Sequence, residues 1–269
     1  MKSGAEEALS WLEHWGLVPD GPEIRTASSL LLPVRRGDSP LMLKLAQHEE
    51  EARGNALMAW WAGQGAAKVI AQEGAALLLE KAEPASELSE LDDDIAIPIL
   101  CDAALALQTD HSGKHPPTDL VPFDIWISDL TAPDHGNDLL DAAAKLAREC
   151  LTANSPAKVL HGDIHHGNVL RFSDGWKVID PKGILGPLCF EFANILPNPL
   201  PSSLDRGRFS NRLGQVVSCT GLPAKDLALW AFVWPALSSI WSEQAGDEKA
   251  ARRAFAFAKM ARSVSEEFG

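Results

Sequence analysis

The sequence predicts an α+β fold with two lobes: a small N-terminal lobe made of an antiparallel β-sheet with a helix, and a larger, mainly helical C-terminal lobe. Short apolar runs separated by turn-forming residues, which are typical of hairpins, are concentrated in residues 1–82, whereas segments with helical spacing dominate residues 83–269. A chain of 269 residues with 46% hydrophobic residues is long enough for two lobes that share a cleft. We therefore place the boundary between the lobes at residues 82 and 83.

The N-terminal lobe is predicted to begin with a helix and to continue as two hairpins separated by a second helix. Residues 5–15 carry apolar residues at helical spacing, and Gly16 is placed to end that helix. A first hairpin joins strands over residues 29–35 and 41–45 through the turn-forming segment 36–40. The remaining predicted elements are a helix over residues 48–62 and strands over residues 65–71 and 75–81.

The second lobe is predicted to hold one tight hairpin among helices. Apolar runs at residues 168–172 and 176–179 flank the turn Ser173-Asp174-Gly175. Periodic apolar residues predict helices before this hairpin, over residues 95–109, 123–130 and 137–151, and after it, over residues 204–219, 224–241 and 248–268.

The loop before this hairpin concentrates the residues that suggest chemistry. It reads HGDIHHGNVL over residues 161–170 and is followed by WKVIDPKG over residues 176–183. Asp163 supplies a carboxylate that can accept a hydroxyl proton, while Asn168 and Asp180 supply hard oxygen ligands for a divalent cation. This set suits phosphoryl transfer, in which catalysis is mostly positioning and charge neutralisation. We predict that Asp163 is the catalytic base and that Asn168 and Asp180 bind Mg²⁺.

Two other interpretations of the same loop remain open on the residues alone. Asp163 and Asn168 are residue types that often cap loops, and Asp180 could be the N-cap of a helix. The loop could also belong to a metal hydrolase, because His161, Asp163, His165 and His166 include the ligand types that bind zinc.

The two strings HGDIHHGNVL and WKVIDPKG resemble the catalytic core of the aminoglycoside phosphotransferase family, and in particular its streptomycin 6-phosphotransferase and hydroxyurea phosphotransferase branch. This resemblance implies a small-molecule version of the protein kinase fold, with ATP and Mg²⁺ bound between the lobes. It implies transfer of the γ-phosphate to a hydroxyl group of an aminoglycoside such as streptomycin, or to a hydroxyurea-like compound. A kinase of choline, homoserine, a ketosamine or a sugar would keep the same core, and a non-catalytic nucleotide-binding regulator is a further alternative.

In a kinase-like lobe, a strand lysine contacts the α- and β-phosphates and pairs with a glutamate of the following helix. Lys44 lies among apolar residues at the end of the second predicted strand, which makes it the candidate, although a solvated strand lysine would give the same pattern. Glu49, Glu50 and Glu51 open the next helix. Glu50 is the predicted partner because it shares a helical stripe with Leu57 and Trp61.

The other predicted nucleotide contacts rest on position in the kinase-like pattern. Ser28 and Ser29 occupy the place of a glycine-rich phosphate loop, where small side chains let backbone amides approach phosphate. Residues 80–82, with Glu80 and Ala82 at their ends, lead from the last strand of the first lobe to the hinge, where backbone groups would receive adenine.

Two residues are predicted to support the catalytic loop. His161 is expected to do so by hydrogen bonding. Glu191 matches in charge an acidic residue that steadies the loop in the family, although it could instead bind a substrate amine.

The net charge of −13 argues against nucleic acid and anionic membranes as partners and favours a cationic acceptor, although acidity also keeps proteins soluble. The widely spaced residues Cys101, Cys150, Cys189 and Cys219 form no CxxC pair, and buried reduced thiols are expected. No signal peptide and no long apolar run are evident. We expect a cytoplasmic protein that is a monomer or a weak homodimer.

Overall fold

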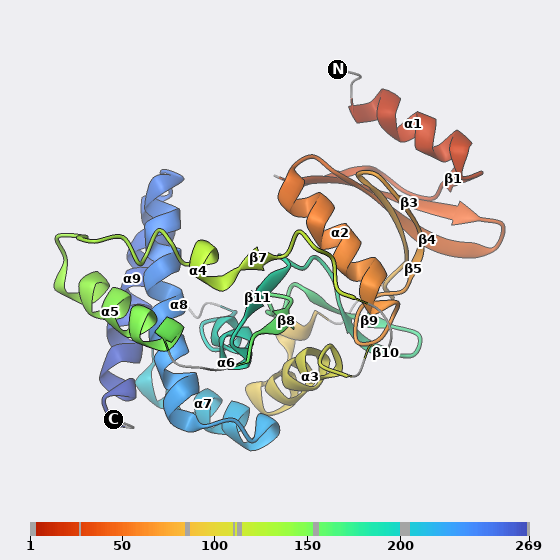
Figure 1. Ribbon diagram of the computed structural model, residues 1–269. Helices are drawn as coiled ribbons and strands as arrows, with labels where there is room; N and C mark the ends of the chain where they lie inside the picture. Colours follow the sequence, from red (N-terminus) through yellow and green to blue (C-terminus); the bar gives the residue numbers. More distant parts are fainter. Residues whose placement is uncertain are drawn as a thin grey trace.

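The computed structural model describes residues 4–26, 28–83, 87–109, 111, 115–152, 156–199 and 205–267, and it shows a sheet lobe joined to a helical lobe (Figure 1). The sheet lobe contains α1 (Gly4–His14), β1 (Val18–Pro19), β2 (Ile24–Arg25), β3 (Ser29–Arg36), β4 (Ser39–Ala46), α2 (Glu49–Trp61), β5 (Val69–Glu73) and β6 (Ala76–Glu80). The predicted hairpins and both helices of this lobe are confirmed.

The six strands of this lobe form one antiparallel sheet in the order β1-β3-β4-β6-β5, with β2 also paired to β3. Strand β5 begins four residues later than predicted. Gly65 takes a positive φ of 73°, and Ala66 bridges Val178 of the second lobe instead of joining this sheet.

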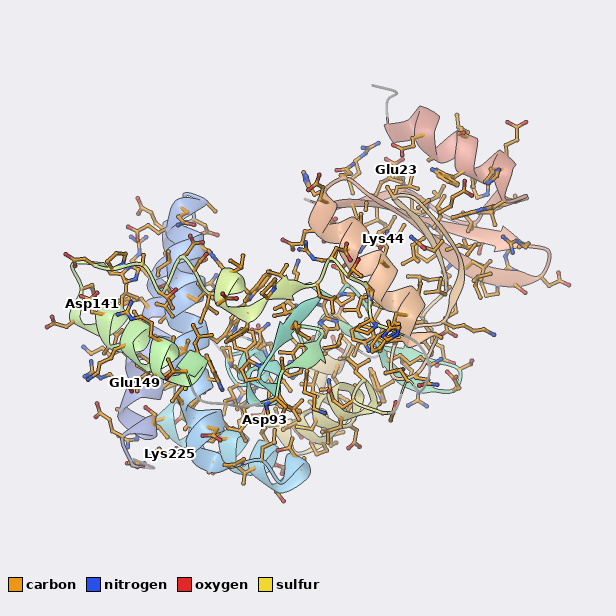
Figure 2. The ribbon with its side chains drawn as sticks, in the orientation of Figure 1. Glu23, Lys44, Asp93, Asp141, Glu149 and Lys225 are labelled. Atoms are coloured by element: carbon orange, nitrogen blue, oxygen red, sulfur yellow. The ribbon has the colours of Figure 1, made fainter. Side chains whose placement is uncertain are left out.

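Alternation along β3 and β4 gives the sheet two apolar faces. One face, with Leu30 and Leu43 among its buried residues, packs under α1 through Ala8 and Leu12. The register pairs Leu31 with Lys44, and both side chains line a cavity on the opposite face. Lys44 therefore points away from α1, and Figure 2 shows it in the sheet lobe beside α2.

The second lobe contains short strands around the catalytic loop and seven α-helices among the described residues. Its elements before the loop are η1 (Leu88–Glu90), α3 (Asp93–Ala106), β7 (Val121–Pro122), α4 (Phe123–Trp126), α5 (Asp138–Thr152) and β8 (Lys158–Leu160). Its elements after the loop are β9 (Val169–Phe172), β10 (Gly175–Val178), β11 (Ile184–Gly186), α6 (Leu188–Glu191), η2 (Ala193–Ile195), α7 (Arg206–Thr220), α8 (Ala224–Gln244) and α9 (Glu248–Ser265).

The predicted hairpin is the antiparallel pair β9 and β10, and the predicted helices are present, although α4 is shorter than expected. A second small sheet was not predicted: β11 pairs parallel with β7 and antiparallel with β8. The apolar run at residues 158–160 is recognisable in the sequence and forms β8, but β7 and β11 are only two and three residues long and carry too little periodicity for recognition.

The larger of the two hydrophobic cores extends across both lobes. It includes Leu57 and Trp61 of α2 and Leu77 of β6, together with buried residues of α3, the catalytic region and α7 to α9. The predicted boundary at residues 82 and 83 follows β6 and directly precedes residues 84–86, which lie outside the described part of the chain. Among the described residues, no helix is both long and apolar enough to cross a bilayer.

Candidate active site

The catalytic loop connects β8 to β9 and is shaped by a glycine. Gly162 has a positive φ of 83°, and a Cβ at this position would lie 2.3 Å from Ile184 Cδ1 of β11. Only glycine combines this backbone conformation with so close an approach. The turn leaves Asp163 next to Asn168, whose Nδ2 donates to the backbone oxygen of Asp163 at 3.0 Å and to its Oδ2 at 3.4 Å.

His161 forms hydrogen bonds within this loop and to the following hairpin. Its Nε2 lies 2.7 Å from the carbonyl oxygen of Ile179, and its Nδ1 lies 3.2 Å from the backbone nitrogen of Asp163. An Nε2–H donor and an Nδ1 acceptor satisfy both contacts, so the ring is neutral. Complete burial lowers the pKa of His161 to about 3, which keeps it neutral at physiological pH.

Glu191 lies beneath the same loop and accepts a hydrogen bond from the backbone N–H of Gly162, at 3.2 Å from Oε1. The residue is 1% exposed, and its Oε2 has no hydrogen-bond partner among the described residues. Burial raises the pKa of Glu191 to about 8. This position fits the predicted supporting role; a carboxyl buried behind the loop is not placed to bind a substrate amine.

Lys44, Glu51 and Asp180 form an ionic cluster between the lobes. Lys44 Nζ lies 2.5 Å from Glu51 Oε2 and also contacts Asp180 Oδ1. Burial acts to raise the pKa of Asp180, but the charge and hydrogen bond of Lys44 outweigh it and hold the pKa below its usual value. Asp180 takes a positive φ of 64°, a conformation that is uncommon for residues other than glycine.

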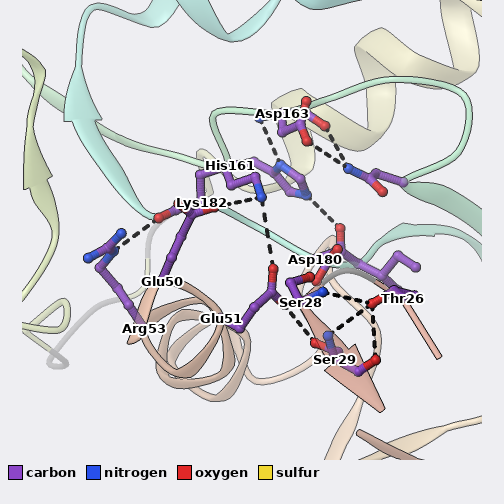
Figure 3. A network of polar contacts seen from close by, with 12 residues as sticks. Thr26, Ser28, Ser29, Glu50, Glu51, Arg53, His161, Asp163, Asp180 and Lys182 are labelled. Carbon is purple, nitrogen blue, oxygen red and sulfur yellow. Dashed lines mark hydrogen bonds and ion pairs between the residues drawn. The ribbon is translucent and has the colours of Figure 1, made fainter. Parts of the chain in front are cut away.

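The structure corrects the choice of Glu50 as the partner of Lys44. Glu50 Oε1 instead lies 2.7 Å from Lys182 Nζ (Figure 3), while the carboxylate that contacts Lys44 Nζ is that of Glu51. The buried residues of α2 are Glu51, Gly54, Asn55, Leu57, Met58 and Trp61. The expected stripe through Gly54, Leu57 and Trp61 is therefore buried, but the glutamate that shares this face is Glu51 and not Glu50. Along this stripe α2 approaches the segment after Asp180 closely, because a Cβ at Gly54 would lie 2.4 Å from the Pro181 oxygen.

Comparison with known proteins agrees with this arrangement. Residues 14–246 match the model of the family described as aminoglycoside/hydroxyurea antibiotic resistance kinase, which is most of the 269-residue chain. The chain belongs to this family. A streptomycin 3''-kinase from Klebsiella pneumoniae is 43% identical over 241 residues, which cover 86% of this chain and 90% of that protein. A hydroxyurea phosphotransferase from Kitasatospora aureofaciens is 29% identical over 268 residues, 93% of this chain and 76% of that protein.

A solved structure supports the fold of this antibiotic resistance kinase. A thermostable mutant of aminoglycoside phosphotransferase APH(4)-Ia, in a ternary complex with ADP and hygromycin B, matches with a TM-score of 0.68. The match covers 95% of this chain and 97% of that chain at 14% identity, so it bears on the fold alone. The predicted two-lobed, protein kinase-like fold is confirmed.

The kinase has a cavity of about 160 Å³ between its lobes. Apolar side chains of the sheet lobe and of the catalytic hairpin line it, together with Lys44 and Asp180; the apolar set includes Leu31, Met42, Leu77, Leu79, Leu170, Phe172 and Ile179. Glu80 and Ala82 also line it. Ala82 lies where the hinge was predicted, and no hydrogen bond links its backbone N–H or C=O to another described residue. An apolar slot of this kind fits a purine base.

Glu80 has a further contact that the sequence did not predict. Its Oε1 lies 2.8 Å from Lys177 Nζ of β10 and 2.6 Å from the backbone nitrogen of Lys68. The side chain therefore links the two lobes, while the predicted nucleotide contact at this position would fall to the backbone.

The predicted serine segment is a tight turn held by Thr26. The Thr26 Oγ1 accepts hydrogen bonds from the backbone nitrogens of Ser28 at 3.3 Å and Ser29 at 2.9 Å. Ser29 is 3% exposed, and its hydroxyl donates to Glu51 Oε2 at 3.2 Å. The Ser29 side chain thus positions the partner of Lys44, and phosphate contact by Ser28 and Ser29 remains a prediction. Ala27 lies outside the described residues.

The two predicted metal ligands lie on neighbouring positions of the hairpin. The backbone N–H of Ile179 donates to the carbonyl oxygen of Asn168 at 2.9 Å, which brings Asn168 beside the residue before Asp180. Because Asn168 Nδ2 faces Asp163, its Oδ1 faces the other way. An amide oxygen and a carboxylate form the sparse, hard oxygen set that suits Mg²⁺ between a protein and nucleotide phosphates.

The zinc hydrolase alternative is wrong for this chain. Both ring nitrogens of His161 are engaged with the backbone, and the Nδ1 of His165 accepts from the Gly167 backbone nitrogen at 3.0 Å. Within the described part of the chain, no group of three or more His, Cys, Asp or Glu side chains is placed to hold a metal ion. Through these contacts His161 and His165 hold the backbone of the loop.

Two residues of the site were missed by sequence reasoning. Asn194 of η2 donates to Asp163 Oδ1 at 2.7 Å, and Lys182 acts together with nearby His165 to counter the effect of burial on the pKa of Asp163. Burial nevertheless raises the pKa of Asp163 above its usual value. Lys182 directly follows Asp180-Pro181, so its position in the motif could have identified it as a residue of the site. Asn194 lies 31 residues from Asp163, so no sequence spacing indicated the contact.

Proposed function

We propose that the protein uses ATP to phosphorylate streptomycin on its 3''-hydroxyl. The observation that carries this proposal is that Asp163 lies near Asp180 and Lys182, beside the cluster that Asp180 forms with Lys44 and Glu51 (Figure 3). The chain is also 43% identical to a streptomycin 3''-kinase. The sequence motif alone favoured the 6-phosphotransferase branch, but the extent of this identity, over 86% of the chain, favours the 3''-position.

In this proposal each residue has a distinct task. Lys44, held by Glu51, grips the α- and β-phosphates of ATP, and the backbone at Ala82 receives adenine. Asn168 and Asp180 would hold Mg²⁺, which when bound neutralises charge on the phosphates. Asp163 orients the acceptor hydroxyl and takes its proton. Its raised pKa makes it a better proton acceptor than a fully solvated aspartate.

The acidic character of the chain supports a cationic acceptor. A net charge of −13 attracts a guanidinium-bearing antibiotic and repels polyanions, so nucleic acid and anionic membranes are poor partners. Because the reaction needs ATP, it would take place in the cytoplasm. The large net negative charge opposes self-association, which favours a monomer or a weak homodimer. The four cysteines are free thiols, and of these Cys101 is buried whereas Cys150, Cys189 and Cys219 are half-buried.

The deciding experiment is to incubate the purified protein with ATP, Mg²⁺ and streptomycin and to locate the phosphate in the product. Acid cleavage separates the streptidine ring from the disaccharide, and mass spectrometry of the two parts identifies the labelled one. Phosphate on the disaccharide is the expected result. Phosphate on streptidine would support the 6-hydroxyl instead. Turnover with hydroxyurea, choline, homoserine, a ketosamine or a sugar, but not with streptomycin, would contradict the proposed acceptor while retaining the kinase reaction.

A further inference from the structure

The carboxylate of Asp163 is held on two sides by amide groups. Asn168, in the same loop, donates weakly to Oδ2 at 3.4 Å, whereas Asn194 of η2 donates to Oδ1 at 2.7 Å. The stronger of these contacts therefore comes from outside the catalytic loop. This contact holds Oδ1. Oδ2 has only the long contact to Asn168 and lies 3.9 Å from His165 Nε2, so it is the oxygen left to accept the proton of the acceptor.

The direction of the Asn194 amide is set by two donors. Trp234 Nε1 lies 2.7 Å from Asn194 Oδ1, and Asn198 Nδ2 lies 2.8 Å from the same oxygen. An indole nitrogen can only donate, so the amide oxygen must face Trp234 and the amide nitrogen must face Asp163. If the Asn194 amide were flipped, its NH2 group would face the Trp234 N–H, and its oxygen would face Asp163 Oδ1. Neither contact could then be a hydrogen bond.

Trp234 is itself fixed by aromatic packing on α8. Its ring meets Phe190 of α6 edge-on at a centroid distance of 5.7 Å, and it meets Trp241, two turns further along α8, at 5.7 Å. Such edge-to-face contacts restrict the ring. The indole N–H is therefore presented to Asn194 by a packed helix, not by a mobile loop.

We propose that Trp234 and Asn194 are positioning residues for the general base, acting in series from α8 through η2 to Oδ1 of Asp163. This inference rests on the proposed kinase reaction and deepens it. The fixed carboxylate directs Oδ2 at the acceptor hydroxyl. As the hydroxyl oxygen bonds to the γ-phosphorus, its proton passes to Oδ2, the bond between that phosphorus and the β,γ-bridging oxygen breaks, and ADP leaves.

Three single variants and one double variant test this arrangement by steady-state kinetics with ATP and streptomycin. Trp234→Phe keeps the packed ring and removes only the N–H; Asn194→Ala removes the contact to Asp163. We expect kcat to fall about fivefold in Trp234→Phe and about fiftyfold in Asn194→Ala, with KM for both substrates within about twofold of wild type. The matched control is Ser239→Ala, which removes a buried side-chain hydrogen bond of the same helix, to the Ala236 carbonyl oxygen at 2.7 Å, and it should keep the wild-type kcat.

The double variant shows whether Trp234 acts through Asn194. If it does, the double variant should be no slower than Asn194→Ala alone. The hydrogen bond from Trp234 to Asn194 is already lost in Asn194→Ala, so Trp234→Phe has no further effect on Asp163. Losses that multiply in the double variant would overturn the inference, as would a loss confined to KM for streptomycin, since Trp234 would then contact the acceptor itself. Wild-type kcat in both single variants would also overturn it.

The folding of the variants and the choice of acceptor are controlled separately. Melting temperatures close to wild type show that the losses in kcat do not reflect unfolding. If the wild-type protein does not turn over streptomycin, the proposed function is contradicted independently of the variants. In that case the same four variants are compared in the slow hydrolysis of ATP by water, in which Asp163 activates water instead of an alcohol, and the same pattern of kcat values is expected.

Discussion

Lys44 and Glu51 form a buried ion pair, with 2.5 Å between Nζ and Oε2 and side chains that are 8% and 5% exposed. The other carboxylate oxygen of Glu51, Oε1, lies 3.9 Å from Lys182 Nζ, so Glu51 lies between Lys44 and Lys182. Ser29 donates to Oε2 as well. The Glu51 carboxylate thus contacts Lys44 of β4 and Ser29 of the turn that replaces a glycine-rich loop. It also lies near Lys182 in the segment that follows Asp180.

The adjacent glutamates allow a sharp test of this pairing. Glu51→Gln should lower kcat/KM for ATP by about tenfold or more, because Lys44 loses the charge that orients it and one partner of a buried pair is removed. Glu50→Gln is the matched control, since Glu50 is 44% exposed and pairs with Lys182, and its effect should be several times smaller. Steady-state kinetics with varied ATP distinguishes them. A larger loss in Glu50→Gln would contradict the assignment.

Asp163 and Asp180 should fail in different ways when they are replaced. Asp163→Ala removes the base, so kcat should fall by about 10²-fold to 10⁴-fold while ATP binding, measured by calorimetry, stays near wild type. Asp180→Ala should abolish activity together with the Mg²⁺ dependence of nucleotide binding. Transfer by Asp163→Ala at close to the wild-type rate would refute the mechanism.

Gly54 offers a test of the contact between α2 and the segment after Asp180. Gly54→Ala would place a Cβ 2.4 Å from the Pro181 oxygen, so the helix or the segment must shift and the ion pair of Lys44 with it. We expect kcat/KM for ATP to fall about tenfold or more, since misplacement of about 1 Å can have effects of that size or larger. The control is Gly214→Ala in α7, where nothing lies within 4 Å of the new Cβ. That change should leave activity intact and stabilise the protein by about 0.5–1 kcal/mol, as judged by denaturant unfolding.

Glu191 should make stability depend on pH. Its pKa is about 8 in the folded protein against an ordinary value of 4.5, so between these pH values the folded state binds more protons than the unfolded state. The contribution of Glu191 is therefore complete below pH 4.5 and is lost as pH rises towards 8, at about 1.4 kcal/mol for each pH unit. Glu191→Gln keeps an oxygen acceptor for Gly162 and removes this titration. Urea unfolding from pH 5 to 8 should show a flatter profile for the variant; an unchanged slope would exclude Glu191 as its source.

The chemistry of the site was largely predictable because its core is local in sequence. Asp163, Asn168 and Asp180 lie within one loop and hairpin, and the residue types there suit phosphoryl transfer directly. Strand alternation likewise placed Lys44 among apolar neighbours, and the structure puts it on the face that lines the cavity.

The contacts that sequence reasoning missed depend on tertiary packing. Glu50 and Glu51 differ by about 100° around a helix, and which of them faces the cleft is decided by how α2 packs against Pro181. Asn194 reaches Asp163 across 31 residues, and Trp234 reaches Asn194 across 40, so neither has a spacing that a linear pattern reveals. Asn and Trp are also common as ordinary loop and core residues, which hides their role.

The continuous core described above bears on how this kinase can vary. Trp61 of the sheet lobe and Ala236 of α8 belong to one buried cluster, although the chain between them passes through the hinge and the whole catalytic region. Exchange of residues 1–82 with the same segment of a distant relative would cut through that cluster and leave mismatched surfaces on both sides. The core residues of the two lobes are therefore expected to have changed together during evolution, so that the lobes of distant relatives cannot be exchanged.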